Sequence, residues 1–477
     1  MTVSIAAGSD QAIALCRTGQ TVSDCKLILV ATILASTLAF LDGAVINIAL
    51  PSIGRELSAS GPSLQWLVTG YLLPLGALQL LAGAVGDHYG HRRTLAFGIA
   101  TFTLASILCA VARDIDQLLF ARVLQGVGAA LLLPNSLAVL GTAYDGNGRG
   151  KAVATWAASG AIASAFGPPI AGWMVDATTW RLVFLLNIPL GLAALGLTWF
   201  KVPESSSEAL PLDFPGTLMA TLGLLGLTLS VTEWSTEGAS TLSFVCGASS
   251  LLLFAGLAWV ESRRGARAMI PLHLFVSSTF VGLNLYTFLL YAAFGALFVL
   301  VPFVLITVHG YSATAAGSAL LPLPVLLGLA SSYASKLTQA YGARAMLSAG
   351  AVIAALGYAL LWNVGDGNYW LRVFPGVFVI ALGMTVVVAP LTTAVLSSVA
   401  ASYTATAAGF NSAVSRIGSL IAIAASGAVM MGSAENMLDA FHRATLVGVV
   451  LCVLSAALVL LALPHTSVSA VQTDLID

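Results

Sequence analysis

The chain has 477 residues, of which 58% are hydrophobic and 8% are charged, whereas about 25% of the residues in an average soluble domain are charged. Its 19 Lys and Arg against 20 Asp and Glu give a formal net charge of −1, which excludes the basic surface that nucleic-acid binding requires. Five cysteines lie without paired spacing, which argues against a disulfide framework and a thiolate metal site. The apolar composition implies that the partner of this chain is lipid.

Fourteen apolar runs along the chain are long enough to cross a bilayer. A hydrocarbon core of about 30 Å takes roughly 20 apolar residues per helix. We expect spans at 27–53, 64–86, 94–112, 117–141, 152–175, 181–200, 214–234, 242–260, 276–308, 313–334, 344–362, 371–396, 404–431 and 444–463. Such continuous runs argue against a membrane barrel, whose strands alternate over about 10 residues. The sequence therefore predicts an all-α integral membrane protein.

The distribution of Lys and Arg predicts the orientation of these spans. With a cytoplasmic N-terminus, twelve of the basic residues lie on the inner side and five on the outer side, while Arg122 and Arg416 lie within spans. This positive-inside bias favours a multi-pass protein of the plasma (inner) membrane with both termini in the cytoplasm. Residues 1–26 have no apolar core behind an early basic cluster, so they are interpreted as a cytosolic tail and not as a signal peptide.

A shared sequence offset indicates an internal duplication. The segments HYGHRR at 88–93 and YGAR at 341–344 place Gly90 and Gly342, and likewise Arg92 and Arg344, 252 residues apart. We therefore expect two six-helix bundles with an inserted two-helix hairpin. The predicted parts are the N-terminal tail 1–26, the first bundle 27–200, linkers and hairpin 201–273, the second bundle 274–463 and a cytosolic C-terminal tail 464–477.

Two charged residues lie inside predicted spans. An ionised Asp42, in the middle of the first span, costs about 2.5 to 3.5 kcal/mol on insertion scales. It must be neutralised, paired or hydrated, so either it carries a proton or it braces a neighbouring helix. Arg122 shares a helix face with Gln125, beside Gly126 and Gly128, which allow close helix approach. Because arginine cannot discharge, it needs an acidic, carbonyl or substrate partner, unless it extends to the headgroups.

The fifth span contains GAIASAFGPPIAG from Gly160 to Gly172. Its adjacent prolines, Pro168 and Pro169, remove two helix donors and predict a kink, while Gly167 and Gly172 leave room for a neighbouring backbone. The kink is interpreted as a hinge, and the alternative is a static bend with no part in transport.

Charged residues also gather at the cytoplasmic end of the second span. Asp87 stands between Gly83 and Gly90, and Arg92 and Arg93 follow. The acid can accept from a facing helix N-terminus, while the arginines hold lipid phosphates or an opposing acid. Contacts made in one conformation and broken in another would form a latch; the alternative is a solvated helix end.

Polar and aromatic side chains within the spans are candidates for lining a substrate cavity. They are Asn47, Trp66, Tyr71, Gln125, Asn284, Tyr291, Phe298, Asn411 and Arg416. The alternative is that the aromatic side chains face lipid or pack on neighbouring helices. The six histidines fall in loops or at span ends, without metal spacing or a catalytic partner, so we assign them no chemistry and expect neither an enzyme nor a bound metal or cofactor.

Six runs in the first six spans resemble the fourteen-span drug:proton antiporters of the major facilitator superfamily. They are LDGAVINIALPSI at 41–53, LQWLVTGYLLPLGAL at 64–78, GAVGDHYGHRRTL at 83–95, LLFARVLQGVGAALLLP at 118–134, GPPIAG at 167–172 and WRLVFLLNIPLG at 180–191. The resemblance implies two bundles that rock around a central site and expose it to one side at a time.

The resemblance also implies roles for single residues. Asp42 belongs to the family's motif of the first span, and Arg122 and Gln125 belong to its proton-relay motif. The gating motif is matched by Gly83, Asp87, Gly90, Arg92 and Arg93, and the antiporter motif by Gly160, Gly167, Pro168 and Gly172. Ala171 stands where the family often has Gly, and Ser335 and Gln339 replace the gating Gly and Asp in the second half.

The predicted function is proton-coupled export of amphipathic drugs or toxic compounds, as in antibiotic resistance. Asp42 is the only acid deep within a predicted span, so about one proton per cycle and a neutral or monovalent cationic substrate are expected. The alternatives are an exporter of a metabolite or tetracycline-type compound, or a proton-coupled importer. The sequence does not reveal whether an accessory protein of the cell envelope takes part.

Overall fold

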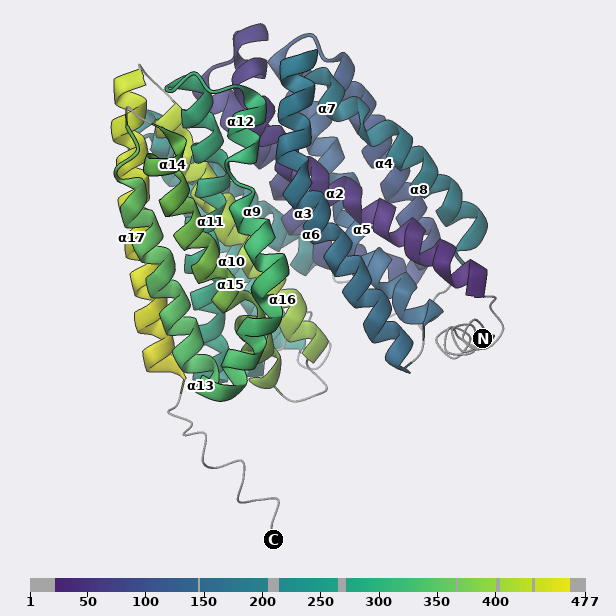
Figure 1. Ribbon diagram of the computed structural model, residues 1–477. Coiled ribbons are helices and arrows are strands. Elements are labelled where there is room, and N and C mark those ends of the chain that lie inside the picture. The colour runs from purple at the N-terminus through teal and green to yellow at the C-terminus, as the bar shows by residue number, and fades with distance from the viewer. Residues whose placement is uncertain are drawn as a thin grey trace, which may run out of the picture. The chain divides into compact units, whose positions relative to one another are not determined.

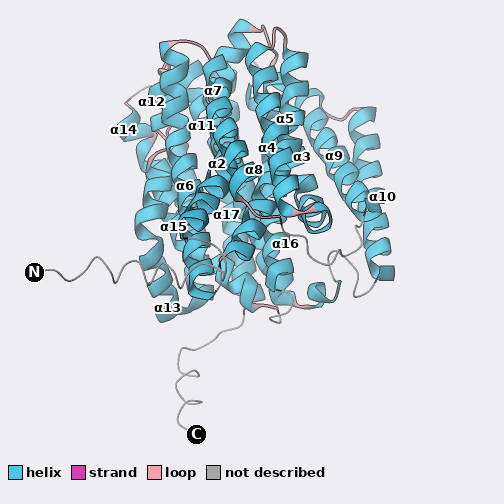
Figure 2. Ribbon diagram, turned by 90° about the vertical axis from the view of Figure 1, so that its right-hand side faces the viewer, coloured by secondary structure: helices cyan, strands magenta, loops and turns pink. Residues whose placement is uncertain are grey.

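The computed structural model describes residues 22–144, 146–204, 214–264, 272–365, 368–399, 404–430 and 434–463. Throughout this part of the chain the elements are helices joined by loops, and none is a strand (Figure 2). The all-α class is therefore confirmed. Most of the predicted N-terminal tail and the whole predicted C-terminal tail lie outside the described residues.

The described helices follow the predicted apolar runs. They are α2 (Val22–Glu56), α3 (Gly61–Tyr89), α4 (His91–Val111), α5 (Ile115–Ala143), α6 (Gly146–Ala177), α7 (Arg181–Leu185), α8 (Asn187–Lys201), α9 (Phe214–Glu237), α10 (Thr241–Arg264), α11 (Ser278–Thr307), α12 (Ala313–Ser318), α13 (Pro322–Leu361), α14 (Tyr369–Arg372), α15 (Phe374–Ser397), α16 (Thr404–Ala425) and α17 (Ala434–Ala462). Two short 3-10 helices, η2 (Leu272–Val276) and η4 (Ser426–Met430), precede α11 and α17.

Eleven helices in the described residues are long and apolar enough to cross a membrane, or twelve if the bent pair Gly61–Gln79 and Leu81–Tyr89 is one span. The predicted spans 152–175 and 404–431 are not among them, although α6 and α16 occupy these ranges. A span count of fourteen therefore stays a prediction.

The chain divides into two compact units. The first unit consists of residues 1–59 and 66–221, and the second of residues 60–65 and 222–477. In the first unit α2 packs against α5, α6 and α8, and α4 packs against α5 and α8 (Figure 1). In the second unit α11 packs against α16 and α17, and α13 packs against α15 and α17.

Side chains fasten both ends of α2 within the first unit. Near its start, the Tyr144 hydroxyl donates to the Cys25 carbonyl oxygen at 2.7 Å. At its end, the Trp180 indole N–H donates to Glu56 Oε2 at 2.6 Å, and Arg181 pairs with the same carboxylate. These contacts fix the position of the middle of α2 relative to its neighbours.

Two glycines let α5 approach its neighbours closely, which confirms the expectation from the sequence. A Cβ at Gly128 would lie 2.7 Å from the backbone nitrogen of Phe102 on α4. One at Gly126 would lie 2.4 Å from the Tyr71 carbonyl oxygen on α3. Because a real Cβ cannot approach backbone atoms this closely, any larger residue forces the helices apart.

Gly126→Ala is therefore expected to destabilise the protein by about 1 to 3 kcal/mol, the usual cost of overpacking. Gly196→Ala on α8 is the matched control, because nothing lies within 4 Å of its added Cβ. This control should be neutral or stabilise by up to about 1 kcal/mol. Thermal unfolding of both variants in the same detergent checks the difference, and equal midpoints would contradict it.

Among the described cysteines, one differs from the sequence prediction. Cys109, Cys246 and Cys452 are free, whereas Cys25 is disulfide-bonded. The prediction was wrong for Cys25, because disulfide formation depends on the spatial approach of two Cβ atoms and not on a recognisable spacing along the chain.

Candidate functional site

The two charged residues predicted inside spans meet in one ion pair within the first unit. Arg122 on α5 donates through Nη1 to Asp42 Oδ2 on α2, and both side chains are 0% exposed. Asp42 is therefore paired, as its predicted depth required. The alternative in which Arg122 extends to the headgroups is wrong, because its guanidinium is fully enclosed.

Side chains from three further positions complete the surroundings of the carboxylate. Gln125 Nε2 donates to Asp42 Oδ1 at 2.8 Å and to Ser106 Oγ on α4 at 2.9 Å. Asn187, the first residue of α8, donates to Asp42 Oδ1 at 3.2 Å. Gln125 Oε1 also accepts from Arg122 Nη1 at 2.7 Å. Asp42 only accepts in this network, which is the pattern of an ionised carboxylate.

The rest of the Arg122 guanidinium is held by α3. Its Nε donates to the Leu67 carbonyl oxygen at 3.1 Å, and its central carbon lies 4.4 Å from the centroid of the Tyr71 ring. Such a cation over an aromatic face is attracted to it. Two buried atoms of the network have no hydrogen-bond partner among the described residues, Arg122 Nη2 and Asn187 Oδ1. The network therefore has one donor and one acceptor unused.

Sequence reasoning missed Ser106 and Asn187. Asn187 lies within WRLVFLLNIPLG. A single amide side chain in this apolar run could have indicated a residue of the buried site. Ser106 gave no comparable signal, because a serine within a span can donate to a carbonyl of its own helix, as Ser106 does to the Phe102 oxygen at 2.9 Å.

The arginines of the predicted latch face an acid that the sequence assigned only to a linker. Arg92 Nε and Arg93 Nε lie 3.6 and 3.3 Å from Glu204 Oε2, just beyond α8. Gly90, between α3 and α4, has φ of 97°, and a Cβ there would lie 2.2 Å from Glu204 Oε1. The glycine therefore provides both the left-handed backbone and the space for the acid.

Asp87 contacts a histidine to which the sequence analysis gave no chemistry. His91 is 6% exposed, with Nε2 lying 3.3 Å from Asp87 Oδ1 and Nδ1 lying 3.0 Å from Asn135 Oδ1. Asn135 donates in turn to the Ala82 carbonyl oxygen at 3.1 Å. His91 therefore links the end of α3 to α5, a role that its position between two predicted spans did not indicate. Gly83 makes only an ordinary contact, 3.9 Å to Pro134.

The residues of the antiporter motif lie on α6, which continues as a helix through both adjacent prolines. Its glycines face α2, since a Cβ at Gly160 would lie 2.7 Å from the Phe40 ring and one at Gly167 would lie 3.3 Å from Leu41. Gly172 is buried. The motif therefore sets how closely α6 approaches the helix that carries Asp42, and the predicted hinge stays a prediction.

The cavity candidates of the first unit are enclosed to different degrees. Tyr71 and Gln125 contact Arg122, and the Tyr71 hydroxyl donates to the Ala39 carbonyl oxygen at 3.0 Å. Asn47 is buried, and its Oδ1 has no partner among the described residues. Trp66 is half-buried.

The candidates of the second unit lie on α11 and α16. Asn284 donates to the Phe280 carbonyl oxygen of its own helix, and Asn411 accepts from Thr287 at 2.7 Å. Aromatic rings from Tyr291, Phe294 and Phe298 form successive edge contacts along α11. Arg416 is half-buried. Within the second unit the structure therefore brings Asn411 against α11 through its contact with Thr287.

Comparison with known proteins identifies the family. Residues 32–423 match the model of the Major Facilitator Superfamily. The chain belongs to this superfamily. It is 32% identical over 376 residues to the uncharacterized MFS-type transporter EfpA of Mycobacterium tuberculosis, covering 76% of this chain and 69% of that protein. It is 31% identical over 408 residues to the multidrug resistance protein Stp of the same organism, covering 85% of this chain and 75% of that protein.

A solved structure shows the same fold. The chain superposes on a bacterial homologue of the human lysosomal transporter Spinster with a TM-score of 0.64 and 17% identity, covering 93% of this chain and 98% of that chain. At this identity the likeness concerns the fold alone. The chain is thus a multi-span membrane transporter of the superfamily that its first six spans resemble.

Proposed function

We propose that the protein exports amphipathic drugs or toxic compounds in exchange for protons. The observation that carries the proposal is the Asp42–Arg122 pair, enclosed among five helices of the first unit, α2, α3, α4, α5 and α8. A carboxylate that is buried and paired with an arginine is a group whose protonation changes the charge balance of its surroundings. Transport proteins place ionisable groups at membrane depth for this purpose.

Protonation of Asp42 would alter the position of Arg122. The guanidinium keeps its charge because arginine does not lose its proton, so a neutral Asp42 leaves that charge uncompensated in the interior. Arg122 would then rely on Gln125 and the Leu67 carbonyl oxygen, both of which it already contacts. Its unused Nη2 gives it one further donor with which to take a new partner. This couples proton binding to a movement of α5 against α2.

The relatives support a drug-like substrate. Stp is named a multidrug resistance protein, and we extend that class of cargo to this chain. We further propose alternating access, about one proton per cycle, and a plasma-membrane location with both termini in the cytoplasm. The last of these follows from the distribution of Lys and Arg.

The stoichiometry predicts how cargo charge determines the driving force. A potential of about 100 mV is worth about 2.3 kcal/mol per charge, and one pH unit is worth about 1.4 kcal/mol. Both the potential and the pH difference drive the export of a neutral compound, and together they sustain a substrate gradient of a few hundredfold. For a monovalent cation exchanged one for one the potential cancels, which leaves about tenfold per pH unit.

Proteoliposomes test this prediction with ethidium as the cation and chloramphenicol as the neutral compound. A potassium diffusion potential at equal pH should drive chloramphenicol and not ethidium, whereas a pH gradient should drive both. If the accumulation of ethidium and chloramphenicol responds to neither the potential nor the pH gradient, proton exchange is contradicted.

A further inference from the structure

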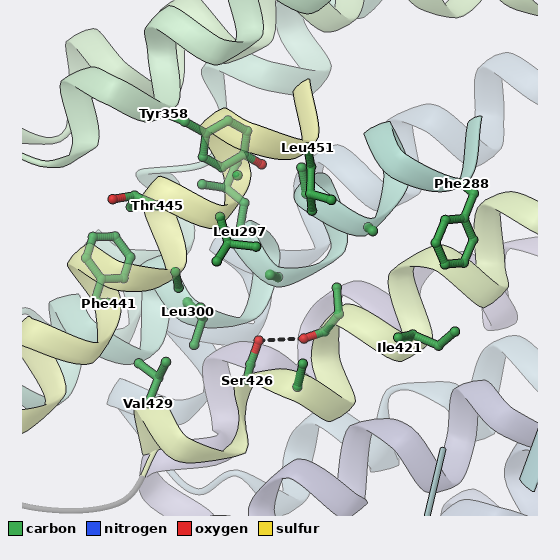
Figure 3. Close-up of a pocket in the computed structure, with 18 residues that line it drawn as sticks. Phe288, Leu297, Leu300, Tyr358, Ile421, Ser426, Val429, Phe441, Thr445 and Leu451 are labelled. Carbon is green, nitrogen blue, oxygen red and sulfur yellow. Dashed lines mark hydrogen bonds between the residues drawn. The ribbon is translucent and has the colours of Figure 1, made fainter. Parts of the chain in front are cut away.

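A cavity of about 290 Å³ lies within the second unit, and its lining does not include residues of the Asp42 network. Residues of α11, α13, α16, η4 and α17 enclose it, and no charged residue is among the described side chains that line it (Figure 3). Its walls are aliphatic and aromatic, with Leu297 and Leu300 from α11, Ile421 from α16, and Phe441 and Leu451 from α17. Such a lining favours an apolar occupant.

Tyr358 of α13 supplies a polar atom to this apolar space. The residue is 4% exposed, and its hydroxyl has no hydrogen-bond partner among the described residues. Figure 3 shows the hydroxyl directed inward, toward Leu297 and Leu451. Gly448 makes room for the ring, because a Cβ there would lie 2.6 Å from the Tyr358 Cδ1 atom. A buried tyrosine hydroxyl usually finds a partner, so this one is available to a ligand.

The other hydroxyls of the lining are already bonded within their own helical segments. Ser426 Oγ donates to the Ala422 carbonyl oxygen at 2.7 Å (Figure 3). Thr445 Oγ1 donates to the His442 carbonyl oxygen at 2.7 Å. Tyr358 is therefore the lining hydroxyl whose donor is unused, and it selects for a ligand with a single accepting group.

Part of the cavity lining on α17 is exposed. Val447 belongs to the lining and is 57% exposed, and Val450 and Val453 continue the exposed apolar face. In the predicted orientation the contributing parts of α11, α13, α16 and α17 all lie in the outer half of the membrane. An apolar molecule in the outer leaflet can therefore reach the cavity along α17 without crossing a polar region.

We propose that this cavity binds a lipophilic molecule that carries one hydrogen-bond acceptor, received by the Tyr358 hydroxyl. Its volume is about twice the ~150 Å³ that holds a single benzene ring in an apolar cavity, so two linked rings or a segment of acyl chain fit. The molecule comes either from the membrane, as an acyl chain with its carbonyl group, or from outside, as an aromatic compound. This binding requires no proton gradient and is independent of the proposed export.

Photolabelling of the full chain in nanodiscs tests the site, with benzophenone as the aromatic probe. Benzophenone has two rings and one carbonyl acceptor, and light inserts it into neighbouring C–H bonds. Adducts mapped by peptide mass spectrometry are expected on the α11 and α17 segments that line the cavity. A fatty acid with a mid-chain diazirine forms the second arm. Preferential labelling of these segments by the aromatic or the acyl probe identifies the source of the ligand.

Three variants connect the labelling to the cavity. Tyr358→Phe keeps the ring and removes the donor, so labelling below saturation should fall roughly two- to tenfold. Ala444→Phe fills the space from the lining of α17 and should abolish labelling there. Ala457→Phe, on an exposed part of the same helix outside the lining, is the matched control and should change nothing.

Size-exclusion chromatography establishes that each variant is folded before it is labelled. Adducts spread evenly over the exposed face of α17, or labelling by both probes that survives Ala444→Phe in folded protein, would overturn the proposal. Loss of labelling in Ala444→Phe with normal labelling in Ala457→Phe would support it, whatever the transport assay shows.

Discussion

Asp42→Asn is expected to reduce proton-driven efflux to the level of empty vesicles while the chain stays inserted and folded. The amide matches the carboxylate in shape and keeps one oxygen that can accept from Arg122. It cannot bind and release a proton, so the step that couples the pH gradient to movement of α5 is lost. Efflux of ethidium from proteoliposomes under a pH gradient measures the effect, and size-exclusion chromatography establishes that the variant is folded.

Asp116→Asn is the matched control for this variant. Asp116 lies in the first turn of α5 and is exposed, so its neutralisation removes the same charge without touching the buried network. Exchange of labelled for unlabelled substrate, which needs no net proton movement, should survive in Asp42→Asn. Full pH-driven efflux by folded Asp42→Asn would remove Asp42 from the coupling mechanism.

The helices were predictable where a run of apolar residues ends in charge or a turn. The predicted span 94–112 corresponds to α4 (His91–Val111), because bilayer thickness fixes how long such a run must be. Breaks within a run were harder to predict. In α13, two predicted spans follow one another across Gly342, where a φ of 81° and a ψ of 155° break the helical geometry. Gly90 at the corresponding place in the first half has φ of 97°, and a pattern of apolar residues does not encode this angle.

The charged members of the site were predictable and their neighbours were not. Asp42 and Arg122 each stand alone in an apolar run, where their cost makes them conspicuous. They are 80 residues apart, so the apolar runs indicate that each charge needs a partner, while spacing alone does not show that the two side chains contact each other. Asn187 is uncharged and costs less inside a span. Glu204 lies just after the end of α8, outside the predicted spans. Acidic residues are common in such a position, so Glu204 did not stand out.

Arg122→Met is expected to destabilise the protein by about 3 to 5 kcal/mol, because it leaves the Asp42 carboxylate buried and without its counter-charge. Replacing both partners of a buried pair by neutral residues of similar size is often harmless. The double variant Asp42→Asn with Arg122→Met should therefore recover much of the lost stability. It should not recover pH-driven efflux, because it has no proton-binding group.

A double-mutant cycle of thermal unfolding in detergent measures the coupling between the two positions. Arg113→Met is the control, since Arg113 is exposed just before α5 and its loss should change stability by no more than about 0.5 kcal/mol. If Arg122→Met and the double variant unfold at the same temperature, the two charges do not stabilise one another. In that case the loss of Arg122 does not leave an uncompensated charge at position 42, and the pair does not hold α5 against α2.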